Sequence, residues 1–425
     1  MMNYGQVLDY ILQMEKFGMK LGLSNITKFL SYLGNPQHSF QSIHVAGTNG
    51  KGSTVAVLDS ILVNAGIRVG VYTSPHLVDF RERIKINGKL IDKGYIADFI
   101  NNNQKKIESL PITYFEAVTA LAFSYFRDER VDVGIIETGL GGRLDATNVI
   151  SPKVTVITNI AVEHTKWLGN KIREIAFEKA GIIKSGIPVI TAAQNHDARR
   201  IIRQVCEQNK SKLISVFDET QWAIKEITRD YTELDIFTRS NKYFSLKLNL
   251  PGRHQIENAI CALIAAELFE PYLKKRISPN AVALGFKNVK WEGRLQRINS
   301  DPDIILDVAH NPAALERIGE YFREFYENTR IIAVFGILSD KDYNLMLKEL
   351  DRLASVIILT RPMTDRAADP GLLADEIGKI RSNFEVIPKV RDAYQVAKNL
   401  CQSNEAILVT GSHFTVGEVL TNLSN

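Results

Sequence analysis

A glycine-rich run with a single lysine, Gly47-Thr-Asn-Gly-Lys-Gly-Ser53, has the residue types and spacing that most directly indicate chemistry. It follows a short apolar stretch, Ile43–Ala46, which predicts a strand, and it leads into Ser53–Ala65, which predicts a helix. Such a turn points backbone N–H groups and the positive end of the helix dipole at an anion, and the lysine can reach terminal phosphates. We therefore expect a nucleoside triphosphate site formed by Gly47, Thr48, Asn49, Gly50, Lys51, Gly52 and Ser53.

The run departs from the usual phosphate-loop pattern in two ways. Four residues normally separate the first glycine from the Gly-Lys pair, whereas Gly47 and Gly50 are closer together here. Gly52 follows the lysine, so the usual hydroxyl ligand of magnesium is missing at that place. Ser74, after the predicted strand Arg68–Thr73, could supply a hydroxyl instead, although a Ser-Pro pair also commonly begins a turn.

Two further side chains could hold a magnesium ion beside this loop. Glu137 follows the apolar stretch Val131–Ile136, and the carboxyl ends of strands in an open parallel sheet face the ligand crevice. His164 lies just past the predicted strand Val154–Asn159, although Mg²⁺ prefers oxygen ligands to imidazole. A helix cap or a solvated loop position is the alternative for both residues.

Other candidates stand on predicted helices or beside a later strand. Lys179 falls in a helical stretch, where the local pattern alone predicts a solvated lysine. Asp307 ends an apolar stretch and could bind a ribose hydroxyl, and Arg294 could bind a phosphate through two parallel hydrogen bonds. The run Thr113-Tyr-Phe-Glu116 fits a capping box that opens a helix over 114–126, so Glu116 could be purely structural.

Composition excludes several classes of protein. The chain has 425 residues, of which 45% are hydrophobic and 24% charged, as expected for a globular protein of two domains. The net charge of +4 is spread thinly, so we expect no nucleic-acid partner. No apolar stretch approaches the length of a membrane span, and no export leader is recognisable. A reducing, cytoplasmic compartment fits the three widely spaced cysteines, Cys206, Cys261 and Cys401.

Alternating apolar and helical stretches predict an α/β fold whose mostly parallel sheet is covered by helices on both faces. Residues 222–250 alternate apolar and charged side chains, which predicts a small antiparallel portion. Asn87-Gly88 predicts a hairpin turn. A second series of strands begins near Asp303, so we place a domain boundary near residue 297, between an ATP-binding domain (1–296) and a C-terminal domain (297–425).

Taken together, the motifs closely resemble those of the folylpolyglutamate synthase/dihydrofolate synthase family of the Mur ligase superfamily, over nearly the whole chain. The most specific stretch is Glu137-Thr-Gly-Leu-Gly-Gly-Arg-Leu-Asp145. The resemblance also rests on Leu21-Gly-Leu-Ser-Asn-Ile26, the Gly47–Ser53 run, Thr73-Ser-Pro-His-Leu77, Phe80-Arg-Glu-Arg-Ile84, Glu178-Lys-Ala-Gly-Ile182, His254-Gln-Ile-Glu-Asn-Ala259, Gly293-Arg294, Asp307-Val-Ala-His-Asn-Pro312 and Thr410-Gly-Ser412.

The resemblance implies an N-terminal P-loop ATPase-like domain, a C-terminal Rossmann-like domain and ATP-dependent amide ligation. The carboxylate of dihydropteroate or a reduced folate would attack the γ-phosphoryl group of ATP, and the amino group of L-glutamate would then attack the acyl phosphate. The implied partners are these small molecules, and the implied cofactor is one or two Mg²⁺ ions. The resemblance further implies that the protein is a monomer. Phosphoryl transfer needs mainly positioning and charge neutralisation, which Lys51 and the loop amides would supply.

The resemblance also implies a role for each site residue. Lys179 would be carbamylated, which turns a cation into an oxygen ligand, and it would be catalytic together with Lys51, Glu137 and His164. The implied magnesium ligands are Ser74, Glu137 and His164. Around the nucleotide, Asn258 would contact adenine, Arg294 phosphate and Asp307 ribose, with His310 near the nucleotide and the incoming amino acid. The pterin side would use Leu23, Ser24, Phe115, Glu116, Leu144 and Asp145.

The motifs favour a bifunctional enzyme of bacterial type, and three other kinds of protein are the alternatives. A muramyl ligase carries a sugar-nucleotide-binding domain before the ATP loop. Only 46 residues precede Gly47 in this sequence, too few for such a domain, so we do not expect a muramyl ligase. A regulatory nucleotide-binding protein without catalysis would not need the candidate magnesium ligands. A monofunctional folylpolyglutamate synthase stays open. Glu163 precedes His164 where the family usually has Asp. Because the predicted ATP residues fall on both sides of residue 297, we expect the domains to close around ATP.

Overall fold

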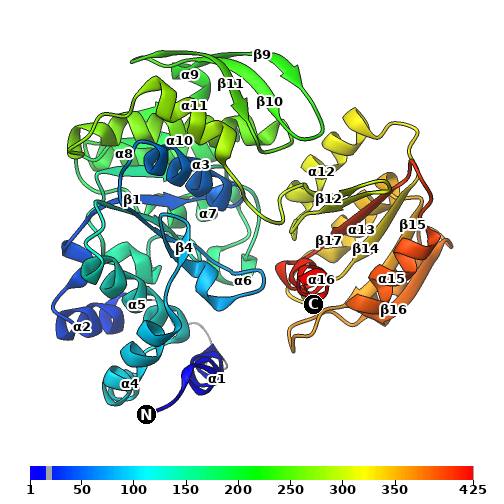
Figure 1. Cartoon of the computed structure of the whole chain (residues 1–425), viewed down its shortest axis with the longest axis horizontal. Helices are drawn as coiled ribbons and strands as arrows, with labels where there is room; N and C mark the ends of the chain where they lie inside the picture. Colours follow the sequence, from blue (N-terminus) through cyan, green and yellow to red (C-terminus); the bar gives the residue numbers. More distant parts are fainter. Residues whose placement is uncertain (16–21, 425) are drawn as a thin grey trace.

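An eight-stranded sheet forms the centre of the N-terminal half of the chain (Figure 1). The computed structural model describes residues 1–15 and 22–424. The strand order is β4-β3-β2-β5-β1-β6-β7-β8, and neighbours pair in parallel except at β2–β3 and β3–β4. The strands are β1 (Gln41–Ala46), β2 (Val69–Tyr72), β3 (Ile84–Ile86), β4 (Lys89–Leu90), β5 (Val133–Glu137), β6 (Val154–Ile157), β7 (Val189–Thr191) and β8 (Leu213–Ser215).

Helices cover both faces of this sheet, which is why its central strands are almost continuously apolar. One face packs against α3 (Lys51–Asn64), α10 (His254–Phe269) and α11 (Pro279–Asn288). The other face packs against α5 (Tyr114–Asp128), α7 (Ile172–Ala180) and α8 (His196–Gln208). Outer and connecting helices are α1 (Tyr4–Glu15), α2 (Ser24–Tyr32), α4 (Lys93–Ser109), α6 (Thr165–Leu168), α9 (Val216–Glu219), η1 (Pro36–His38), η2 (Phe80–Arg83), η3 (Ala146–Val149) and η4 (Glu270–Tyr272).

A three-stranded antiparallel sheet follows, as the alternation over 222–250 predicts. Its strands are β9 (Gln221–Ile227), β10 (Thr232–Phe237) and β11 (Lys242–Leu248), with β10 in the middle. Leu234 and Ile236 of β10 join the core formed with α10 and α11, while alternate residues are partly exposed. The turn between β9 and β10 reaches the C-terminal half, where Arg229 Nη1 lies 3.0 Å from Asp303 Oδ2.

The C-terminal half is built around a six-stranded sheet of order β12-β13-β17-β14-β15-β16, in which β12 alone is antiparallel. The strands are β12 (Gln296–Ser300), β13 (Asp303–Leu306), β14 (Ile331–Phe335), β15 (Val356–Arg361), β16 (Phe384–Lys389) and β17 (Ala406–Thr410). One face packs against α12 (Pro312–Phe325), α13 (Tyr343–Leu353) and α14 (Pro370–Gly378), and the other against α15 (Val390–Leu400) and α16 (His413–Ser424).

The predicted fold class is confirmed in both halves. The four strands predicted in the N-terminal half correspond to β1, β2, β5 and β6, and the second series begins with β13, at the predicted Asp303. The Asn87-Gly88 hairpin joins β3 and β4, with φ of 48° and 75° at its two residues. The pattern did not predict β8, β12 and β16, because these edge strands are short or partly exposed and lack a long apolar run.

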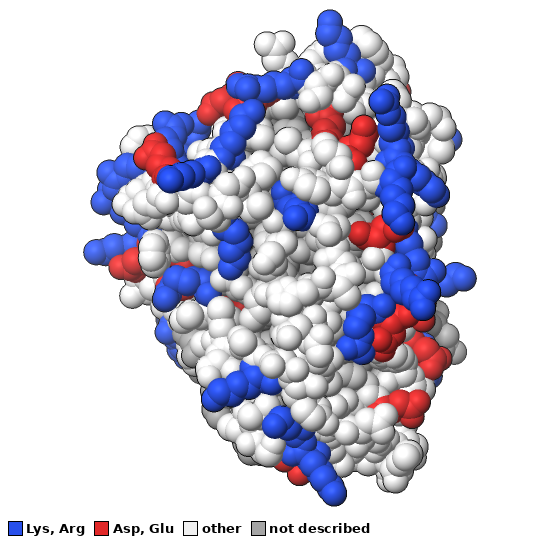
Figure 2. Space-filling view, turned by 90° about the vertical axis from the view of Figure 1, so that its left-hand side faces the viewer, with Lys and Arg blue, Asp and Glu red and all other residues white. Residues whose placement is uncertain are grey.

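The surface shows no single block of charge on the face seen in Figure 2. Lysine and arginine side chains are scattered over that face, with acidic side chains between them. Of the helices that the structure describes, none combines the length and the apolar character needed to cross a bilayer.

The loop after β2 packs against the C-terminal half of the chain. Leu77 contacts the apolar cluster that includes Val308, Val409 and Val416. Gly417 of α16 makes this contact possible, since a Cβ at that position would lie 2.1 Å from the Leu77 carbonyl oxygen. The position of this loop, which also carries Ser74, therefore depends on the C-terminal sheet.

We expect Gly417→Ala to separate the two halves and to lower stability. Alanine favours a helix over glycine by about 1 kcal/mol, but the backbone carbonyl of Leu77 cannot yield to a Cβ as a flexible side chain could. Small-angle scattering should give a larger radius of gyration, and thermal unfolding should begin at a lower temperature. Gly5→Ala in α1 is the control, because its nearest atom is 3.4 Å away. A stabilised Gly417→Ala with unchanged scattering would contradict the contact.

Candidate active site

A cleft of about 300 Å³ lies where the carboxyl ends of strands from both sheets meet. It is lined by most of the residues predicted to bind nucleotide and metal: Thr48, Asn49, Gly50, Lys51, Gly52, Ser53, Ser74, Glu137, His164, Asn258, Arg294, Asp307 and His310. Gly47 and Lys179 lie next to this lining, joined by a hydrogen bond of 2.7 Å from Lys179 Nζ to the Gly47 carbonyl oxygen. The structure thus brings residues from both halves of the sequence to one cleft.

Gly50, which precedes α3, and Gly52, in the first turn of α3, both have close neighbours that leave little room for a side chain. A Cβ at Gly50, where φ is 88°, would lie 2.2 Å from Oδ1 of Asn258. A Cβ at Gly52 would lie 2.7 Å from the indole ring of Trp291. The indole therefore occupies the space that the Ser or Thr of the usual phosphate loop would need, which explains the glycine at position 52.

Lys51, the first residue of α3, lies close to Glu137, the last residue of β5. Lys51 Nζ donates to the carbonyl oxygens of Gly47 and Thr48, at 3.2 Å each, and lies 3.9 Å from Glu137 Oε1. Burial raises the pKa of Glu137, although the charge of Lys51 opposes this shift. The backbone N–H of Ser74 donates to Glu137 Oε2 at 3.4 Å. Ser74 and Glu137, predicted from separate strands, are thus neighbours.

Lys179 is buried, so the solvated position that the helical pattern predicts is wrong. The carboxyl end of α7 packs against the loop after β5, where the Arg143 N–H donates to the Glu178 carbonyl oxygen at 2.7 Å. This packing turns the side chain of Lys179 toward the phosphate loop and leaves it 4% exposed. Burial and the nearby charge of Lys51 lower the pKa of Lys179 to about 7, so a large fraction of its amine is neutral near pH 7.

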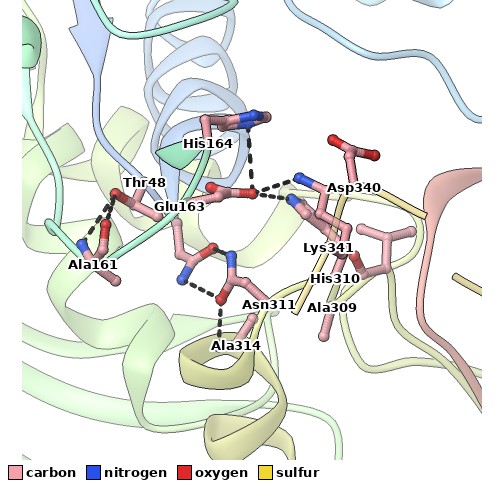
Figure 3. A network of polar contacts seen from close by, with 12 residues as sticks. Thr48, Ala161, Glu163, His164, Ala309, His310, Asn311, Ala314, Asp340 and Lys341 are labelled. Atoms are coloured by element: carbon pink, nitrogen blue, oxygen red, sulfur yellow. Dashed lines mark hydrogen bonds and ion pairs between the residues drawn. The ribbon is translucent and has the colours of Figure 1, made fainter. Parts of the chain in front are cut away.

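Glu163 joins the two halves of the cleft through a single carboxylate oxygen (Figure 3). Its Oε1 lies 2.9 Å from His310 Nε2, 3.0 Å from Lys341 Nζ and 3.6 Å from His164 Nε2. Burial alone would raise the pKa of Glu163, but His310 and Lys341 hold it well below its ordinary value. The carboxylate is therefore ionised and binds the side chains of both His310 and Lys341 from the C-terminal half.

Sequence reasoning missed His413, which lines the cleft, and Lys341, which pairs with Glu163 of the cleft lining. Lys341 stands in a polar run, Ser339-Asp-Lys-Asp342, where a lysine is expected in solvent, yet its side chain is 8% exposed. Its place just beyond the carboxyl end of β14 was the available signal. His413 lines the cleft with its ring centroid 5.5 Å from that of His310, and burial lowers its pKa well below 6.5.

The two histidines beside Glu163 differ in their surroundings. Burial, opposed in part by Glu163, lowers the pKa of His164 to about 4, so its imidazole is neutral and able to act as a ligand. His310 Nδ1 faces the Val308 carbonyl oxygen at 2.9 Å, while its Nε2 faces the carboxylate. The His310 ring is thus held at both of its nitrogens by oxygen atoms of neighbouring residues.

Asp307 and Arg294 are both fixed by the backbone around the domain junction. The Leu295 N–H donates to Asp307 Oδ2 and the Ala309 N–H to Oδ1, each at 2.8 Å. Each oxygen keeps a further lone pair that a hydroxyl could use. Arg294 Nη1 donates to the Gly293 carbonyl oxygen at 3.1 Å, and burial lowers the pKa of its guanidinium.

Two amide side chains tie the phosphate loop to its surroundings. Asn258 lies against Gly50, and its Nδ2 donates to Gln255 Oε1 at 2.9 Å. Asn49 and Asn311 exchange two hydrogen bonds between the domains, at 3.2 and 2.9 Å. Asn311 also caps α12 through its Oδ1, so the loop contacts the first turn of that helix directly.

The predicted pterin residues do not line this cleft; they lie on the N-terminal side of the chain. Phe115 packs against Gly139, with its ring centroid 6.0 Å from that of Tyr72. Leu23 and Leu144 are half-buried and Ser24 is exposed, while Leu21 of the same motif lies outside the described residues.

The carboxylates of Glu116 and Asp145 hold local structure in place. Glu116 accepts hydrogen bonds from Ile26 N at 3.1 Å and from Thr113 N at 2.8 Å, so the predicted capping box is confirmed and α2 is held as well. Asp145 accepts from Gly139 N at 2.9 Å and Leu140 N at 2.8 Å, which shapes the loop after β5. Both side chains thus shape the segments around Phe115.

Known proteins share this arrangement of domains. Residues 45–266 match the Mur ligase middle domain, and residues 293–413 match the Mur ligase glutamate ligase domain. The dihydrofolate synthase/folylpolyglutamate synthase of Bacillus subtilis (strain 168) is 37% identical over 415 residues, which cover 96% of each chain. The structure of Mycobacterium tuberculosis folylpolyglutamate synthase complexed with ADP and AMPPCP is 31% identical, with a TM-score of 0.91 over 99% of both chains. E. coli FolC in complex with DHPP and ADP is 31% identical, with a TM-score of 0.88 over 98% of this chain and 97% of that chain.

We expect Glu163→Gln to weaken the contact between the domains. The amide keeps the shape of the side chain but removes the charge that holds His310 and Lys341, which costs about 1–3 kcal/mol. Urea unfolding should show this loss, and Lys341→Met should cost less in the Glu163→Gln background than in the wild type. Glu376→Gln, which breaks an exposed pair with Lys379, is the matched control. Strictly additive effects of the two substitutions would contradict the interaction.

Proposed function

Since this chain belongs to the Mur ligase family, and within it to the dihydrofolate and folylpolyglutamate synthases, we propose that it joins L-glutamate to dihydropteroate, to reduced folates or to both. ATP would activate the acceptor carboxylate as an acyl phosphate. The amine of glutamate would then form the amide through a tetrahedral intermediate and release phosphate. We further propose that it acts in the cytoplasm as a monomer.

The proposal is carried by one observation. The phosphate loop with Lys51, and Glu137 beside it, face Asp307 and His310 of the C-terminal half across a single cleft. A ligase that forms a hydrolysable acyl phosphate benefits from a cleft that closes and excludes water. We assign 1–296 to an ATP-binding domain and 297–425 to a glutamate ligase domain.

The residues at the cleft fit magnesium. Ser74 and Glu137 are neighbours, and His164 is a neutral imidazole on the same lining. Among the residues that the structure describes, no three His, Cys, Asp or Glu side chains gather into a metal site. Mg²⁺ suits such a place because it usually takes few protein ligands and completes its shell with water and phosphate oxygens. Ser74, Glu137 and His164 would hold it, and it would neutralise phosphate charge when bound.

The side chains of this chain would do the remaining work by position and charge. The amides of Gly47–Ser53 and the Lys51 ammonium would bind the phosphates. Asn258 would contact adenine and Asp307 the ribose, and Arg294 would bind a phosphate. His310, held by Glu163, would lie beside the nucleotide and the incoming glutamate. Leu23, Ser24, Phe115, Glu116, Leu144 and Asp145 would form the pterin side.

Release of ADP by purified protein with Mg-ATP and L-glutamate tests this function. Turnover with dihydropteroate and with tetrahydrofolate would identify a bifunctional enzyme. Turnover with one acceptor alone would identify a dedicated dihydrofolate synthase or a chain-extending enzyme, and turnover with neither would contradict the proposal. Lys51→Ala should lower turnover by about 100-fold or more, whereas Lys379→Ala, at an exposed position, should not change it.

We predict that Lys179 carries a carbamate. Its neutral amine would form an N–C bond to CO₂ and release one proton, and the remaining N–H could still donate to the Gly47 carbonyl oxygen. Protein kept in ¹³C-bicarbonate should show a carbamate ¹³C signal that Lys179→Ala lacks. That variant should stay folded and lose turnover, with partial rescue by a small carboxylate.

Lys184→Ala is the matched control for this experiment. Lys184 is a second lysine whose pKa burial lowers, and its Nζ donates to the Asn148 carbonyl oxygen at 3.2 Å. The Lys184→Ala variant should keep both the signal and the turnover. Near-normal turnover of Lys179→Ala, or a carbamate signal that persists in it, would remove Lys179 from the site.

A further inference from the structure

Arg83 is a nearly buried cation that none of the roles above uses. It ends η2 within the motif Phe80-Arg-Glu-Arg-Ile84, and it is 8% exposed. A buried arginine is normally paired with a carboxylate, because an unpaired charge in the interior is costly. Within the described part of the chain, no carboxylate forms an ion pair with Arg83, whereas Arg81 of the same short helix pairs with Asp79 at 2.7 Å.

Within residues 1–15 and 22–424, the Arg83 side chain contacts His76 and Tyr114, and neither carries a negative charge. Its Nε donates to His76 Nδ1 at 2.8 Å, and a nitrogen that accepts carries no proton, so this imidazole is neutral. Its guanidinium carbon lies 5.4 Å from the ring centroid of Tyr114, within cation–π distance. Neither contact satisfies the Nη groups, which a carboxylate could bind through parallel hydrogen bonds.

Arg83 lies between the predicted metal residues and the predicted pterin residues. The Thr73 N–H donates to its carbonyl oxygen at 3.0 Å, which places Arg83 beside Ser74. Ile84, the next residue, pairs with Tyr72 across β2 and β3, and the Tyr72 ring contacts that of Phe115. The guanidinium is also close enough to favour the ionised form of Glu137.

We propose that Arg83 binds the carboxylate of the acceptor substrate, the group that receives the γ-phosphoryl group of ATP. This inference rests on the proposed ligase function. The acceptor must set its aromatic body near Phe115 and its carboxylate near the phosphates at Lys51, and Arg83 stands between these places. One carboxylate oxygen forms the bond to γ-phosphorus as the bond to the leaving oxygen of ADP breaks. The other oxygen keeps its contact with the guanidinium, which orients the attack.

Calorimetry with a matched pair of ligands tests this role. Dihydropteroate and its carboxamide analogue, each titrated with Mg²⁺ and AMPPCP present, differ only in the charge of the group that Arg83 would bind. The wild type should prefer the carboxylate by about tenfold or more. Arg83→Gln should reduce this preference to about twofold or less without weakening the carboxamide. Arg83→Lys should give an intermediate preference, because an ammonium cannot form two parallel hydrogen bonds.

The controls separate this role from a structural one and from the function itself. Arg81→Gln, in the same short helix, should keep the wild-type preference, and AMPPCP should bind all folded variants equally. Full preference for the carboxylate in Arg83→Gln, or in Arg83→Lys if the glutamine variant does not fold, would overturn the assignment. Failure of the ligase function would appear differently, as no ADP release by the wild type with either acceptor.

Discussion

Buried positive charge at the meeting edge of the two sheets is the constraint on which the rest of this structure depends. A cation removed from water must be neutralised or hydrogen-bonded. Glu137 lies near Lys51, and one oxygen of Glu163 holds both His310 and Lys341. Lys179 donates a hydrogen bond to the Gly47 carbonyl oxygen, which supplies a dipole rather than a full charge. A sheet edge at which buried cations are only partly neutralised by carboxylates suits a polyanionic ligand. The cations lie near strand ends because ligands of open α/β sheets bind at that edge.

The same constraint explains why the cleft needs both domains. Glu163 comes from the loop after β6, whereas His310 and Lys341, which it holds, follow β13 and β14. Asn49 and Asn311 make a second link, and Leu77 against Gly417 makes a third. Each of these contacts touches a segment that also carries a candidate ligand residue. The contacts that join the two halves of the chain therefore also position the site.

Local patterns predicted those parts of the structure that local forces determine. Central strands with continuous apolar residues, the Thr113 and Glu116 capping box and the Gly47–Ser53 loop follow from residue types within a few positions. The burial of Lys179 does not, because it depends on how α7 packs against a loop more than thirty residues away in the sequence. Glu163 and Lys341 form an ion pair although they are 178 positions apart in the sequence, so the residues next to either of them do not predict the pair. Edge strands such as β16 were not predicted for a related reason, since a strand that is largely exposed needs no apolar run in its sequence.

Trp291 explains why Lys51 of the phosphate loop is followed by glycine, not serine or threonine, at position 52. Its indole fills the space over Gly52, and Lys85 Nζ lies 5.7 Å from the centroid of the same ring. Trp291 belongs to the segment that leads from the first domain into β12. A shift of that segment must move the indole against the first turn of α3, where the loop amides point into the cleft. A serine at position 52 would restore a hydroxyl that could bind a metal, but it would displace this ring. Glycine at this position lacks that metal contact and keeps the phosphate loop packed against the domain junction.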